Sequence, residues 1–77
     1  MGVFCMLTYR LLEIKGEEYV YAYYPDGNED APGKVGISKN GNKRIIEESA
    51  QDFWNRYANH ALNGIDLSQK SGMVAWY

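Results

Sequence analysis

One segment of the chain, residues 49–64, combines a helical pattern with signals for both helix ends, and it constrains the fold more than any other. Its apolar residues recur at three- and four-residue spacing, which places them on one face of a helix. They are Ala50, Phe53, Trp54, Tyr57, Ala58 and Ala61. Ser49 predicts the N-cap with Asp52 as its capping-box partner, and Asn63-Gly64 predicts a left-handed stop. We therefore expect one amphipathic helix that buries Phe53, Trp54, Tyr57 and Ala61 in the core.

The remainder of the chain has the pattern of strands and turns. Strand-forming runs occupy residues 7–15, 19–24, 34–38 and 43–47 before the helix, and residues 73–77 after it. Gly16 marks a turn between the first two runs, and Asn40-Gly41 favours a type I′ turn between the next two. The order β-β-β-β-α-β predicts an α+β domain: a mostly antiparallel sheet of four to five strands with the helix on one face.

The length and composition indicate one small domain over residues 1–77, in which residues 1–5 form an N-terminal extension of little structural weight. A chain of 77 residues buries only about 60% of its unfolded surface, so its core is thin. Seven tyrosines and two tryptophans exceed what such a core can cover. This aromatic surplus favours a protein partner, beginning with a second copy of the chain.

Charge and motif content argue against several other classes of function. A net charge of −2 disfavours nucleic-acid binding, and the basic residues from Lys34 to Arg44 suit a solvated sheet edge. The chain lacks an apolar run of membrane-spanning length, and a single cysteine, Cys5, excludes an internal disulfide. We expect a cytoplasmic protein that neither enters a membrane nor binds nucleic acid.

No motif of the sequence indicates a cofactor or a metal. The run Asp26–Asp30 begins like a calcium-binding loop, but Ala31 and Ile37 stand where that loop requires glycine and glutamate. Phosphate-binding loops and nucleophile elbows are likewise missing from the sequence. We therefore expect a non-enzymatic protein with no cofactor, no metal site and no catalytic residue.

Tyr19, Tyr21 and Tyr23 alternate along one strand and must share one face of the sheet. The small residues Val20 and Ala22 on the opposite face suit contact with a bulky helix, which predicts that the tyrosine row lies on the face away from it. That row could be an ordinary half-exposed sheet surface, a platform for a small ligand, or a protein interface. We favour a homodimer interface formed by Tyr19, Tyr21, Tyr23 and Trp76.

The alternative is a small enzyme or ligand-binding protein with a site near Arg56 and His60, completed by a second subunit. Asp52, Arg56 and His60 recur at four-residue spacing, so they are expected along one flank of the helix. There His60 would act as a general base, Arg56 would bind an anionic substrate, and Tyr57 would lie nearby.

Overall fold

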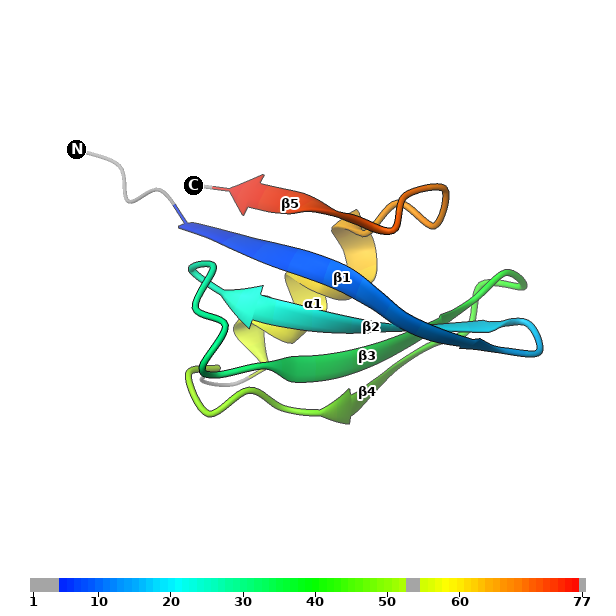
Figure 1. Ribbon diagram of the computed structural model, residues 1–77, viewed down its shortest axis with the longest axis horizontal. Coiled ribbons are helices and arrows are strands. Elements are labelled where there is room, and N and C mark those ends of the chain that lie inside the picture. Colours follow the sequence, from blue (N-terminus) through cyan, green and yellow to red (C-terminus); the bar gives the residue numbers. More distant parts are fainter. Residues whose placement is uncertain (1–4, 53–54, 77) are drawn as a thin grey trace.

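The structure is a computed structural model that describes residues 5–52 and 55–76. Within these residues, five strands form one antiparallel sheet, and a single helix lies against one face of it (Figure 1). The elements in chain order are β1 (Cys5–Lys15), β2 (Glu18–Pro25), β3 (Gly33–Ser38), β4 (Lys43–Glu47), α1 (Arg56–Gly64) and β5 (Ser71–Trp76). In the sheet the order is β4-β3-β2-β1-β5, so β2 is central and the last strand lies beside the first. The predicted α+β class and element order are confirmed.

Two tight connections set the hairpins, and the second differs from its predicted type. Gly16 begins the short β1–β2 connection with a positive φ of 60°. In the β3–β4 connection Gly41 has a φ of 98°, but Asn40 is not among the residues with positive φ. A type I′ turn requires positive φ at both central residues, so that prediction was wrong. The hairpin itself is present, with Val35 opposite Ile45.

The helix begins six residues later than expected, because the observed N-cap is Asn55 and the N-cap expected from the sequence is Ser49. Asn55 is the observed N-cap, in a left-handed conformation and without a side-chain capping bond. Ser49 is instead buried in the segment before the helix, where its hydroxyl donates a hydrogen bond to the Ala31 carbonyl. The helix ends at Gly64 as expected, but neither Asn63 nor Gly64 has the positive φ of a left-handed stop. Gly64 is required by packing, because a Cβ there would lie 2.7 Å from Val74 Cγ1.

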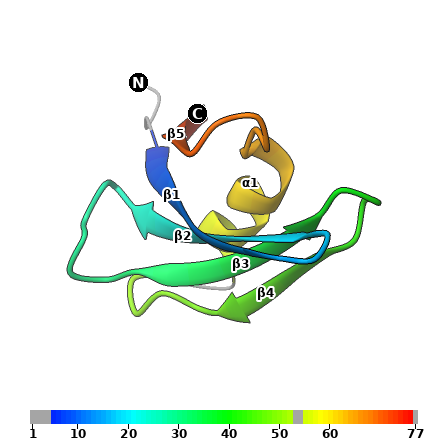
Figure 2. The ribbon, with the colours of Figure 1, turned by 45° about the vertical axis from the view of Figure 1, so that its right-hand side comes forward.

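The core lies between the helix and one face of the sheet, which we call the inner face. At one side of the sheet, β1 and β5 curve toward the helix (Figure 2). The buried residues that form this core are Leu7, Tyr9, Tyr21, Tyr23, Val35, Ala58 and Ala61. Ala61 confirms the expected core, and Tyr57 packs against its edge. Phe53 and Trp54 lie outside the described residues.

The tyrosine row belongs to this inner face, so the predicted assignment of the two faces was wrong. The reason is complementary size. The helix contributes the small side chains of Ala58 and Ala61, and the large phenols of the sheet fill the space beside them. Val20 and Ala22 point to the other side, which we call the outer face.

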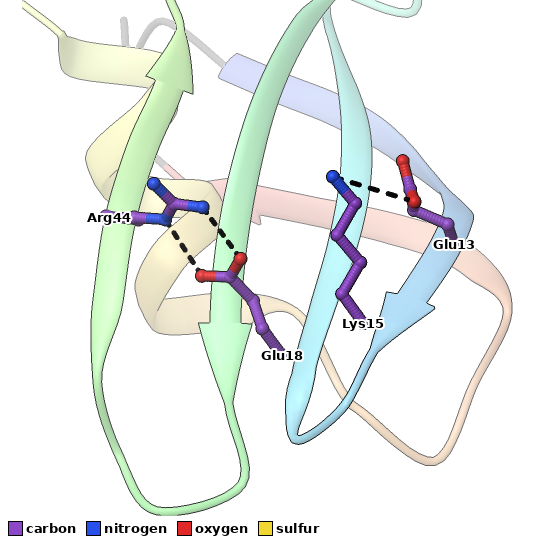
Figure 3. A network of polar contacts seen from close by, with 4 residues as sticks. All are labelled: Glu13, Lys15, Glu18 and Arg44. Carbon is purple, nitrogen blue, oxygen red and sulfur yellow. Dashed lines mark hydrogen bonds and ion pairs between the residues drawn. The ribbon is translucent and has the colours of Figure 1, made fainter.

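The outer face carries small residues flanked by long charged ones. Arg10 and Lys34 stand on either side of Ala22 in the strand register. Farther along, the Glu18 carboxylate accepts hydrogen bonds from Arg44 Nε and Nη2, both at 2.8 Å (Figure 3). This pair lowers the pKa of Glu18. The Glu18–Arg44 pair lies next to Gly36, where a Cβ would lie 2.6 Å from the Glu18 carboxylate.

Candidate functional site

The four residues predicted as an interface do not form an exposed surface. Tyr21 and Tyr23 are 0% exposed, and Tyr19 packs against the edge of the core. Trp76, at the end of β5, also lies on the inner face and contacts the helix. A partner cannot reach Tyr21 or Tyr23 while the helix is in place, so these side chains do not provide a docking surface.

The buried hydroxyls of Tyr21 and Tyr23 form hydrogen bonds with the segments that precede and follow the helix. The Tyr23 hydroxyl donates to Asp52 Oδ2 at 2.9 Å and accepts from the Ser49 amide at 3.0 Å. The Tyr21 hydroxyl donates to the Gln69 carbonyl at 2.9 Å, in the connection from the helix to β5. Burial raises the pKa of both tyrosines. The row therefore fixes the crossover between β4 and β5.

Asp52 does not lie on the flank of the helix, where its four-residue spacing from Arg56 predicted it. It lies before the helix, 4% exposed, and accepts three hydrogen bonds. Besides that from Tyr23, these come from the backbone amides of Tyr57 at 2.9 Å and Ala58 at 3.0 Å. Both amides belong to the first turn of the helix, whose N–H groups lack intrahelical acceptors. Asp52 thus supplies the cap that Asn55 does not.

Arg56 and His60 do lie together, as the alternative prediction required. With Asn59 and Asn63 they line a shallow depression of about 250 Å³ on the helix. The His60 ring stacks on the indole of Trp76, with ring centres 3.8 Å apart and planes 8° apart. Tyr57 is directed elsewhere: its hydroxyl donates to the Asp26 carboxylate at 3.1 Å. The predicted group of three is therefore split.

A second shallow depression, of about 440 Å³, lies on the outer face near the start of β5. Its polar lining comes from Thr8, Arg10, Tyr24, Glu29 and Ser71. Arg10 donates to the Tyr24 hydroxyl at 3.0 Å, and its guanidinium lies 5.8 Å from the centre of the same ring. These contacts hold the Arg10 side chain beside Tyr24 in this depression.

Two side chains of the acidic run after β2 accept hydrogen bonds, one within the loop and one from the helix. Asn28 Oδ1 accepts a hydrogen bond from the Asp30 amide, and Asp26 accepts the one from Tyr57. Among residues 5–52 and 55–76, no group of three or more His, Cys, Asp or Glu side chains is placed to hold a metal ion.

The backbone of β5 offers the feature that the sequence prediction missed. The Leu11 amide donates to the Lys70 carbonyl at 2.6 Å, while the Met6 carbonyl accepts from Asp26 on the β2 side. Successive residues of a strand direct their N–H and C=O groups to opposite sides, so Leu7, Tyr9 and Leu11 face β5. Their partners Gly72 and Val74 therefore face β1.

Ser71, Met73 and Ala75 consequently direct their N–H and C=O groups away from the sheet. Since β5 is the last strand in the sheet order, these groups have no neighbouring strand in the described part of the chain. Their side chains all lie exposed on the outer face. We call this outward side of Ser71–Trp76 the β5 edge. Its one signal in the sequence is the absence of charged residues from the run SGMVAW.

The helix of the described residues is too short and too polar to cross a membrane. Comparison of the chain with models of protein families, with curated proteins and with solved structures gave no match.

Proposed function

We propose that the protein is a small non-enzymatic interaction domain that binds a second copy of itself by strand pairing at the β5 edge. The observation that carries the proposal is the set of outward-directed backbone groups on a strand with nothing to discourage pairing. A free row of N–H and C=O groups is a template for another strand. In β5 no charge, proline or bulge interrupts that row from Ser71 to Trp76.

The opposite edge of the sheet has the protection that β5 lacks. β4 contains Lys43, Arg44 and Glu47, and a register shift interrupts its ladder with β3. Charges and bulges are the usual means by which edge strands avoid pairing. The difference between the two edges supports the proposal that β5, and not β4, is the edge that takes a partner.

The side chains of β5 also favour a partner. Met73 is 58% exposed, which makes it the most exposed of the large hydrophobic residues described. A second copy suits this edge because antiparallel strands of identical sequence present the same donors and acceptors to each other. The thin core of a chain this short adds a reason to bury further apolar surface.

The test is the mass of the protein in solution, measured by light scattering after size exclusion over a range of concentrations. We expect the mass to rise from the 8.8 kDa of one chain towards twice that value. Met73→Pro should abolish the rise, because it removes an outward N–H without removing a bond to β1. Far-UV circular dichroism should show that this variant keeps its fold.

Met73→Thr is the matched control. It removes the methionine side chain but keeps the amide, so it should associate more strongly than Met73→Pro. A wild-type protein that stays monomeric at all concentrations would refute the proposal, as would a folded Met73→Pro variant with unchanged association.

The alternative of an enzyme or ligand-binding site at Arg56 and His60 has weaker support. Its depression of about 250 Å³ lies below the range of about 300–1,000 Å³ typical of ligand sites. Neither ion pair found among the described residues involves Arg56 or His60. An imidazole stacked on Trp76 also has one ring face covered. The β5 edge is therefore the better supported candidate.

A further inference from the structure

The geometry of β5 restricts how two copies can pair, and this inference rests on the self-association proposed above. Ser71, Met73 and Ala75 are the residues whose backbone groups point outward. In an antiparallel pair, two opposed residues of this type exchange two hydrogen bonds. A register that opposes outward residues with outward residues therefore forms bonds, and a register shifted by one residue does not.

The faces of the sheet impose the same condition. A twofold axis perpendicular to the sheet keeps each outer face on the same side, so opposed residues must share a face. Ser71, Met73 and Ala75 all lie on the outer face, whereas Gly72 and Val74 lie on the inner face beside Tyr9 and Gly64. Sliding the strands by one residue would bring inner side chains against outer ones.

We propose that the two copies pair about a twofold axis at Met73, so that Met73 lies opposite the partner's Met73. This register uses all the outward residues of both strands, because Ser71 then lies opposite the partner's Ala75. Shifting it by two residues in either direction leaves one outward residue of each copy outside the paired segment of β5. The result is one continuous antiparallel sheet with the two β5 strands at its centre.

This register also accounts for the exposure of Met73. Side chains directly opposed across an antiparallel pair lie about 4.5–5.5 Å apart at Cβ. The two thioethers would cover each other at the axis, where an unbranched side chain adapts easily to its neighbour. The smaller Ser71 and Ala75 would flank them on the same face.

The test is a charge exchange at the axis. Met73→Arg and Met73→Glu should each weaken the homodimer, because like charges would face each other there. A mixture of the two variants should form heterodimers well above the half share given by random pairing. Native mass spectrometry distinguishes the three species, since the two variants differ in mass, and circular dichroism checks that both fold.

The same exchange at Ala75 is the matched control. Ala75 is also exposed on the outer face of β5, but in this register it faces the partner's Ser71 rather than itself. Heterodimer enrichment should therefore be much smaller for Ala75→Arg with Ala75→Glu than for the Met73 pair. A dimeric wild type with equal enrichment at both positions, or with more at Ala75, would overturn the register while leaving self-association intact. A monomeric wild type would refute both proposals.

Discussion

At the scale of single residues, Asp52 joins the helix to the sheet. Its buried carboxylate accepts one hydrogen bond from the Tyr23 hydroxyl of β2 and two from backbone amides in the first turn of the helix. A carboxylate without partners would be costly to bury, and here each partner is also a buried or partly buried donor that needs an acceptor. The positive end of the helix dipole adds to the attraction. One side chain thus satisfies donors on two elements.

We expect Asp52→Ala to destabilise the protein strongly. The variant leaves the Tyr23 hydroxyl and two helix amides without their acceptor, and each buried unpaired group costs about 1–3 kcal/mol. Asp30→Ala is the control, since Asp30 lies exposed in the loop after β2 and such substitutions change stability by about 0.5 kcal/mol or less. Urea unfolding of both variants measures the difference. Equal stabilities would contradict the role given to Asp52.

At the scale of the elements, β3 fits the sheet because two of its glycines leave room for side chains of β2. Gly33 faces the ring of Tyr23 on the inner face, and a Cβ there would lie 2.2 Å from ring atom Cε1. Gly36 faces the Glu18–Arg44 pair on the outer face. The first neighbour is a fully buried ring, and the second is the end of a flexible side chain.

The same substitution at these two glycines should therefore have unequal effects. Gly33→Ala forces a packed ring to move. We expect it to lower the free energy of unfolding by about 3 kcal/mol or more, the upper end of the range of about 1–3 kcal/mol typical of overpacking. Gly36→Ala only displaces an exposed ion pair, and such pairs contribute about 0–1 kcal/mol. Denaturant unfolding of the two variants makes the comparison. A larger loss from Gly36→Ala would mean that the outer-face pair supports the sheet more than its exposure indicates.

The strands could be predicted from the sequence, but their order in the sheet could not. Alternating residues between glycine-rich turns predicted each strand closely, because these signals are local. The position of β5 beside β1 was not predictable, since strand order depends on where the crossover through α1 returns. The interface prediction at Tyr21 and Tyr23 failed for a related reason: β2 is buried on both faces, so its residue sizes alone do not tell which face meets a helix of small residues.

At the scale of the whole molecule, the sheet and the helix differ in how firmly they are held. β2 is bonded on both sides by β1 and β3 and buries most of its residues. The helix has nine residues and buries only Ala58 and Ala61 completely. Helices this short are marginal on their own, so α1 depends on its contacts with the sheet and on Asp52.

We expect native-state hydrogen exchange to separate these two parts. The amides of Tyr21 and Tyr23 should exchange only through global unfolding. Those of Ala61 and Leu62 should exchange through a local opening with a smaller free energy. Exchange followed by nuclear magnetic resonance at increasing urea concentrations distinguishes the two routes. Equal opening free energies throughout would show instead that helix and sheet unfold as one unit.

The contrast between the two sheet edges determines how many further copies one molecule can bind in the proposed pairing. A sheet with two open edges can add copies at both ends and grow into a filament, whereas one open edge is used up by the first partner. With β4 bulged and charged, the proposed pairing at β5 is a closed assembly that ends at two copies. The bulge and the charges of β4 would then prevent a pair of copies joined at β5 from adding further copies and growing into a fibre.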